Sequence, residues 1–381
     1  MVQSKISNSC KLVPLLLSWF AANARDLPWR RTRDPYAIWV SEIMLQQTQV
    51  KTVIPYWERW MRELPTIQAA AKASPAKVHK LWEGLGYYTR VRNLQKAAQQ
   101  IVARHDGKFP EHFDDILALP GIGRYTAGAI ASIAFSQPHP ILDGNVIRLL
   151  TRVFGIKRNP RDKQTDAQLW QLASELVIHA KAAKDAKPPG QNPSRSSRPL
   201  RDENSCSNLN QSLMELGALI CTPRSPDCPA CPVQKRCVAR KENLQDRLPN
   251  LSKRAAATER RFIAFVVERN GKFLVRQRSA GVINAHLWEF PNLEIRARLC
   301  KPQHVARAAR ALELKSAGSK PLCIIKHSIT RYRIKLEAWR AKPVKPSTKE
   351  TPGRWLALAQ LHKLAFTSAH KKILTHLRAL R

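Results

Sequence analysis

The chain has 381 residues, enough for two or three domains that each bury a hydrophobic core. Its 65 lysines and arginines outnumber its 28 aspartates and glutamates, which gives a formal net charge of +37. Such an excess indicates a polyanionic partner. Nucleic acid is favoured over a membrane surface, because the charge is spread along the chain and no basic helix has a lipid-facing stripe.

An apolar stretch over residues 12–20 has the composition of a signal-peptide core. Pro14 interrupts it, however, and the chain continues into residues 25–30 without a convincing cleavage site. We therefore predict a helix of the hydrophobic core here. No segment approaches the roughly 20 apolar residues that cross a bilayer. We expect an intracellular protein, and in a bacterium a cytoplasmic, nucleoid-associated one.

Helical patterns fill the chain as far as residue 240. Apolar residues from Val50 to Met61 recur at helical spacing, and Pro55 predicts a kink or a helix end close to it. Further helices are predicted over residues 75–105, 114–119, 125–135, 145–155, 165–182 and 209–220. Because almost nothing in this region alternates as a strand does, we predict an all-α domain over residues 1–238.

The sequence LPGIG at residues 119–123 predicts a turn whose two glycines can adopt positive φ and let another backbone come close. The helix expected after it would expose its first amides, which form an anion site suited to a phosphate. Asp143 follows in a turn just after an apolar pair. A purely structural helical hairpin has the same glycine pattern, but the nearby carboxylate and the basic composition favour contact with DNA.

Two carboxylates of this domain could carry chemistry. Glu42 lies close to the polar residues 46–49 in an otherwise bulky and apolar segment, and Asp143 ends the hairpin stretch. Two carboxyl groups in different environments can divide the cleavage of a glycosidic bond. One protonates the leaving group, and the other stabilises an oxocarbenium-like sugar. For either residue alone, a helix cap or a surface charge is the commoner explanation.

Four of the eight cysteines crowd into seventeen residues: Cys221, Cys228, Cys231 and Cys237. A disulfide framework is not expected in a large chain without a signal peptide. Four thiolates at this spacing suit either a tetrahedral zinc ion or a [4Fe–4S] cluster.

Two segments interrupt the regular patterns. Residues 181–205 are rich in proline and basic residues and predict a flexible insertion, for which a solvated loop is favoured over a direct DNA contact. Residues 239–260 are polar and charged and predict an interdomain linker.

The chain changes character after residue 260. Two apolar stretches flank Asn270-Gly271, which is typical of a strand–turn–strand unit. Further strands are predicted over residues 322–325 and 332–339, and helices over residues 303–313 and 356–378. A small α+β domain over residues 261–381 is therefore predicted.

Four longer motifs add a family resemblance: WVSEIMLQQTQV at 39–50, GLGYY at 84–88, LPGIGRY at 119–125 and LDGN at 142–145. In order and spacing they resemble the MutY-type adenine DNA glycosylases of the helix-hairpin-helix superfamily, and the resemblance covers nearly the whole chain. It implies that Glu42 is the general acid that acts on adenine and that Asp143 stabilises the cationic sugar. Tyr125 and Asn145 would complete the catalytic pocket.

The resemblance also implies DNA and cofactor contacts. Glycosylases of the endonuclease III type have a lysine at the position of Tyr125, and a phenol cannot form the imine that this lysine forms. Little or no strand cleavage is therefore expected. The cysteine spacing resembles the cluster loop of these enzymes, which favours [4Fe–4S]. The residues expected to bind substrate or DNA are Arg30, Gln47, Thr48, Leu85, Tyr87, Gly121, Gly123 and Gln211.

The motif GVINAHLWEFP at 281–291 resembles the MutT/Nudix-like domain with which this family recognises 8-oxoguanine. A pyrophosphohydrolase needs a carboxylate-rich helix to hold Mg²⁺, but residues 301–313 are basic and nearly free of acids. A recognition module is therefore expected. Ser328 and Thr330 are its candidate lesion contacts, whereas Ile329 and Arg331 replace the phenylalanine and histidine that are usual in the family.

The sequence thus predicts a monomeric, monofunctional adenine DNA glycosylase of base-excision repair that acts on A:8-oxoguanine or A:G mispairs in double-stranded DNA. A bifunctional pyrimidine-lesion glycosylase is opposed by Tyr125 and by the C-terminal domain. A non-catalytic lesion-binding protein has no use for Glu42 and Asp143. A Nudix hydrolase is excluded by the missing acidic helix.

Overall fold

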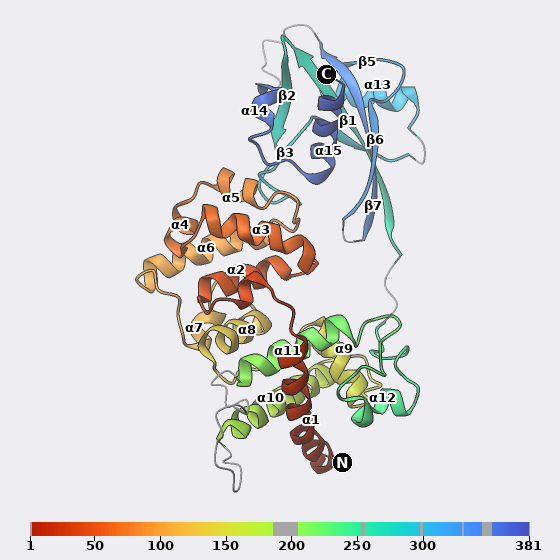
Figure 1. The fold of residues 1–381 in the computed structure, drawn as a ribbon. Helices are drawn as coiled ribbons and strands as arrows, with labels where there is room; N and C mark the ends of the chain where they lie inside the picture. The colour runs from red at the N-terminus through yellow and green to blue at the C-terminus, as the bar shows by residue number, and fades with distance from the viewer. Residues whose placement is uncertain are drawn as a thin grey trace. The chain divides into compact units, whose positions relative to one another are not determined.

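The computed structural model describes residues 2–185, 205–252, 256–297, 300–329, 331–344 and 353–380 (Figure 1). The chain forms two compact units. The first comprises Met1–Lys72 and Asn93–Lys253, and the second comprises Ala73–Arg92 and Arg254–Arg381. Most of the predicted insertion, residues 186–204, lies outside the described residues.

The first unit is helical throughout its described part, as predicted. Its helices are α1 (Val2–Asn23), α2 (Pro35–Leu45), α3 (Val50–Glu63), α4 (Ile67–Lys72), most of α6 (Thr89–Arg104), α7 (Phe113–Leu117), α8 (Arg124–Phe135), α9 (Gly144–Val153), α10 (Lys163–Asp185), α11 (Ser205–Leu219) and α12 (Val238–Lys241), with short 3₁₀ turns at Pro28–Arg30 and Gln234–Arg236. The described helices include none that is both long and apolar enough to cross a membrane.

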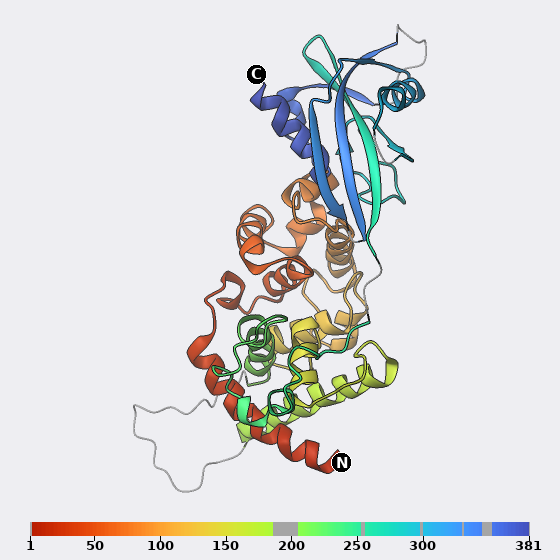
Figure 2. The same ribbon diagram turned by 90° about the vertical axis from the view of Figure 1, so that its right-hand side faces the viewer.

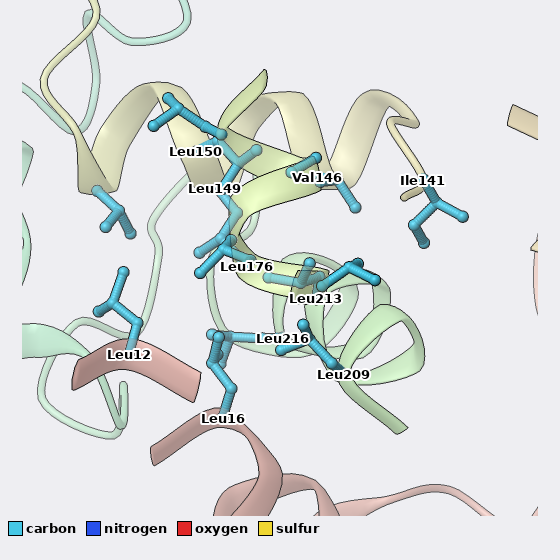
Figure 3. Close-up of a cluster of buried hydrophobic side chains, with 14 of the residues drawn as sticks. Leu12, Leu16, Ile141, Val146, Leu149, Leu150, Leu176, Leu209, Leu213 and Leu216 are labelled. Atoms are coloured by element: carbon cyan, nitrogen blue, oxygen red, sulfur yellow. The ribbon is translucent and has the colours of Figure 1, made fainter. Parts of the chain in front are cut away.

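Helix α1 joins the main core of this unit, which confirms the prediction of a core helix at residues 12–20. Leu12 and Leu16 lie one turn apart and pack with leucines and valines of α9, α10 and α11 (Figure 3). Burial of this apolar cluster fixes the position of α9. The N-terminus of α9 is therefore held rigidly, and Asp143 is its N-cap residue.

Pro55 lies inside α3, so of the two predicted outcomes it does not end the helix, and the burial of Val53 and Trp60 offsets one lost backbone hydrogen bond. One helix prediction was wrong in detail. The single helical stretch predicted over residues 75–105 is divided into α5 (Pro75–Leu81) and α6. The turn between them contains Gly84 and Gly86, whose φ angles are 115° and 72°.

The second unit contains a mixed sheet. Its strands are β1 (Thr258–Arg269), β2 (Lys272–Gln277), β3 (Trp288–Glu289), β4 (Asn292–Ile295), β5 (Leu314–Ala317), β6 (Cys323–Ile329), β7 (Tyr332–Pro343) and β8 (Arg354–Ala357). Strands β1 and β7 run parallel at its centre, and the other pairs are antiparallel. Asn270 and Gly271 both have positive φ, as a two-residue turn of type I′ requires, which confirms the predicted hairpin.

Strand β1 alternates between two cores. Ile263 and Phe265 face α13 (Pro302–Ala311), whereas Ala264 and Val266 face α15 (Ser368–Ala379). Figure 2 accordingly shows these two helices on opposite sides of the sheet. The helix predicted over residues 356–378 is divided into the end of β8, α14 (Leu358–Leu361) and α15, because residues 354–357 pair with β2.

Candidate active site

Glu42 is a buried carboxyl group on α2, with 5% of the residue exposed. Its Oε2 accepts a hydrogen bond of 2.8 Å from the Tyr125 hydroxyl on α8, and Met214 Sδ lies 3.3 Å from the same hydroxyl. Burial raises the pKa of Glu42 to about 7, although the Tyr125 hydrogen bond and the Arg30 charge favour ionisation. Glu42 can therefore keep its proton near neutral pH and still give it up, as a general acid must.

Asp143 is fixed by the start of α9. Its Oδ1 accepts the backbone amides of Asn145 and Val146 at 2.9 and 2.7 Å, and its Oδ2 accepts the Asn145 side-chain amide at 2.9 Å. Burial raises the pKa of Asp143, and these three donors oppose the rise. Asp143 and Tyr125 both act electrostatically on Glu42, so the structure brings together the four predicted catalytic residues, Glu42, Tyr125, Asp143 and Asn145.

The Asn145 side chain is oriented by a hydrogen bond from Arg148. Its Oδ1 accepts a 2.9 Å hydrogen bond from Arg148, which also donates to the carbonyls of Gly217 and Cys221, each at 2.7 Å. A Cβ atom on Gly217 would lie 2.7 Å from that of Asn145, so only glycine permits α11 to approach α9 this closely. A chain of contacts thus leads from Asp143 to the first residue of the cysteine loop.

Arg30 lies beside a second carboxylate, which sequence reasoning missed. Glu215 on α11 accepts hydrogen bonds from Arg25 and Arg30 at 2.7 to 3.1 Å. Burial alone would raise the pKa of Glu215, yet the two guanidinium groups lower it to about 2. Glu215 is the only acidic residue of its helix, and an isolated acid in an apolar helix was the available signal.

The predicted hairpin joins α7 to α8. Gly121 has φ of 79°, and a Cβ atom there would lie 2.6 Å from that of Asn93. Gly123 is the N-cap of α8 and has no side chain to cap the helix, and a Cβ atom added there would contact nothing. The first amides of α8 are therefore available to an anion such as a phosphate.

The remaining predicted contacts are spread over both units. In the first unit, Gln47 is exposed with φ of 56° at the end of α2, Thr48 is half-buried beside it, and Gln211 donates to Ser207 within α11. In the second unit, Tyr87 is 44% exposed and Leu85 is buried.

Of the candidate lesion contacts, Ser328 is exposed near the end of β6, where it pairs with Arg333 of β7. Thr330 lies outside the described residues.

The cysteine loop surrounds one cavity. Cys221, Cys228, Cys231 and Cys237 all line it, together with Arg152, which donates to Cys221 Sγ at 3.3 Å. Four thiols that line one cavity suit either a tetrahedral zinc ion or a multi-iron cluster.

The helical fold, with the buried Glu42 and the partly buried Asp143, is matched by a class of DNA-repair enzymes. Residues 40–175 match the family model of the HhH-GPD superfamily of base excision DNA repair proteins, and residues 263–376 match the NUDIX domain. A solved thermostable thymine-DNA glycosylase superposes on 62% of this chain and 98% of its own, with 26% identity and a TM-score of 0.51. The protein is thus a DNA glycosylase with a C-terminal Nudix domain.

Curated relatives narrow this class. The adenine DNA glycosylase of Rattus norvegicus is 35% identical over 94% of this chain and 76% of its own length. That of Homo sapiens is 34% identical over 94% of this chain and 72% of its own length. The chain belongs to the adenine DNA glycosylase family.

Proposed function

We propose that the protein hydrolyses the N-glycosidic bond of adenine mispaired with 8-oxoguanine or guanine, without cleaving the strand. The observation that carries this proposal is the juxtaposition of Glu42, Tyr125 and Asp143. Membership of the adenine DNA glycosylase family supports adenine as the base.

Each carboxyl group has its own step. Glu42, protonated near neutral pH, donates its proton to a ring nitrogen of the flipped adenine as the bond to C1′ breaks. The departing base takes the bonding electrons, and Asp143 stabilises the positive charge left on the sugar. Its position is fixed by the amides of α9, so it needs no rearrangement when the charge develops. Water then adds to C1′ and loses a proton to the Glu42 carboxylate, which restores the acid.

Tyr125 supports monofunctional chemistry. Burial raises the pKa of its phenol, which keeps the hydroxyl protonated. A protonated hydroxyl can donate to Glu42 but cannot form a Schiff base with the abasic sugar.

DNA engagement involves both units. The amides at the start of α8 bind a phosphate, Arg30 and Gln211 belong to the adenine pocket, and Gln47, Thr48, Leu85 and the exposed Tyr87 contact the DNA around the extruded base. The Nudix-like domain reads 8-oxoguanine through Ser328 and Thr330.

The cysteine cavity is proposed to hold a [4Fe–4S] cluster through Cys221, Cys228, Cys231 and Cys237. When bound, the cluster ties the loop into one rigid body and adds a redox-active group. Arg148 and Arg152 connect this loop to α9.

A duplex with one A:8-oxoguanine pair tests the proposal. The wild-type protein should release adenine and leave a site that breaks only in hot alkali. Glu42→Gln should bind the duplex but lose about 10³-fold in single-turnover rate, as expected for a lost general acid. Glu111→Gln, an exposed substitution of the same type, is the control. Strand cleavage without alkali, trapped by borohydride, would contradict the monofunctional reading.

A further inference from the structure

The segment Ala73–Arg92 lies within the residues matched to the glycosylase superfamily, yet it belongs to the same compact unit as the C-terminal domain. It contains the turn at residues 84–88. Two hydrogen-bonded contacts join this segment to the C-terminal residues of the unit, and they lie immediately before the turn and shortly after it.

The first contact is made by Glu83, of which 5% is exposed. Its carboxylate accepts the backbone amide of Phe366 at 2.9 Å and the ammonium groups of Lys371 and Lys80, each at 2.8 Å. Lys80 also donates to the Leu364 carbonyl at 2.9 Å. Removing this carboxylate would leave the buried Phe366 amide unpaired, whereas the two ammonium groups are partly exposed to water.

The Phe366 segment is hydrogen-bonded to the motif at residues 281–291, here called the recognition motif. The Trp288 amide donates to the Ala365 carbonyl at 2.9 Å, and the Thr367 amide donates to the Trp288 carbonyl at 3.1 Å. Trp288 is part of the motif at residues 281–291. Glu83 is thus separated from this motif by a single backbone segment.

The second contact is made by Arg92. Its Nη1 donates to the Ala285 carbonyl of the same motif at 3.1 Å, and its Nη2 donates to Thr89 at 3.0 Å. Ala285 is buried, so the arginine reaches into the motif. The C-terminal residues of the unit therefore contact both flanks of the turn, at Arg92 through the motif itself and at Glu83 through the neighbouring Phe366 segment.

The turn between these contacts has a constrained backbone. Gly84, Gly86 and Tyr87 have φ angles of 115°, 72° and 48°. The Trp82 indole donates to the Gly86 carbonyl at 3.1 Å, and Arg90 lies over the Tyr87 ring at 5.6 Å. A non-glycine residue with positive φ persists only where its surroundings hold it there. The exposed Tyr87 side chain thus lies between the two flanking contacts, in a turn whose backbone its surroundings hold.

We propose that Glu83 is a specificity-determining positioning residue, which couples recognition of the base opposite adenine to the placement of Tyr87 in the DNA. This inference rests on the proposed function. When the C-terminal domain engages 8-oxoguanine, the Glu83 contact sets the turn in its inserting geometry. With guanine opposite adenine, the C-terminal domain binds the opposite base less strongly, and the Glu83 contact has less effect on the placement of Tyr87.

The test compares wild type with Glu83→Gln, Lys371→Met and the double variant. Glu294→Gln, which breaks the ion pair with Arg260 elsewhere in the unit, is the matched control. Single-turnover adenine release is measured opposite 8-oxoguanine and opposite guanine. A 2-aminopurine beside the opposite base reports insertion of Tyr87 through its fluorescence, and thermal unfolding monitors the fold.

Each single variant should lower the rate opposite 8-oxoguanine, relative to the rate opposite guanine, by about tenfold. This is a typical size for coupling between two sites. The 2-aminopurine signal should fall in parallel, and the double variant should lose little more than either single one, because the two residues share one contact. An unchanged ratio, or equal losses on both substrates that follow thermal stability, would overturn the coupling alone. Wild-type rates that do not distinguish the two substrates would overturn the recognition role of the C-terminal domain as well.

Discussion

Two regions of the first unit bury a carboxyl group and give it opposite properties. Glu42 meets a tyrosine hydroxyl, and its pKa is about 7. Glu215 meets two guanidinium groups, and its pKa is about 2. Both residues have little contact with solvent, so burial alone does not decide the charge. The charge of the partner decides it, and a neutral donor leaves the proton available for catalysis.

The largest effect expected beyond Glu42 itself concerns Asp143, the other carboxyl group of the candidate active site. Asp143→Asn should keep the start of α9 intact, because asparagine caps helices as well as aspartate does. It should lower adenine release by about 10²- to 10³-fold, because the amide carries no charge to stabilise the sugar cation. Single-turnover kinetics measure the loss. Asp34→Asn, at the N-cap of α2, is the control and should retain the wild-type rate.

The second prediction compares how Glu42 and Glu215 contribute to the free energy of unfolding. Glu215→Gln should lower the free energy of unfolding by about 2 kcal/mol, since Arg30 loses its partner while the more exposed Arg25 is screened by water. Glu42→Gln should cost far less at pH 6, where Glu42 is already neutral. Urea unfolding of both variants gives the comparison, and equal losses would contradict the assigned charges.

A third prediction follows from the raised pKa of Glu42. Above pH 7 the rate of base release should fall about tenfold per pH unit as the acid ionises. Stability should follow the same group. The folded state holds the Glu42 proton more tightly than the unfolded chain does. The contribution of Glu42 to the free energy of unfolding is therefore complete below pH 4.5 and is lost as pH rises through 7. A rate that is constant to pH 9 would exclude Glu42 as the acid.

The smallest expected effect concerns Tyr125, the neutral hydrogen-bond partner of Glu42. Tyr125→Phe removes a donor that favours ionised Glu42, so the alkaline fall in rate should move upward by about one pH unit, the equivalent of one hydrogen bond. Tyr36→Phe removes another buried hydroxyl, which donates to the Leu64 carbonyl, and should leave the profile in place. A downward shift after Tyr125→Phe would reverse the assigned role.

Much of this fold could be predicted from local patterns. The helical periodicity of the first unit and the Asn270-Gly271 hairpin are encoded by neighbouring residues. The short strands β3, β4, β5 and β8 could not be found, because each exists only through pairing with a distant strand. The same limit explains why one predicted helix was assigned over β8.

The site divides in the same way. Glu42, Tyr125, Asp143 and Asn145 occur in continuous motifs, and the structure brings them together. The partnership of Glu215 with Arg25 and Arg30 spans about 190 residues of chain, and no short-range pattern encodes it. The attachment of Glu83 to the C-terminal residues of its unit is likewise a purely tertiary feature.

The protonation of Glu42 is the central claim, and difference infrared spectroscopy measures it directly. Spectra of the wild type between pH 5 and 9, compared with those of Glu42→Gln, should contain a carboxylic-acid carbonyl band that is absent from the variant. This band should disappear with a midpoint near pH 7, together with the rate of adenine release. A band already lost by pH 5 would show that Glu42 is ionised at neutral pH and that another group donates the proton.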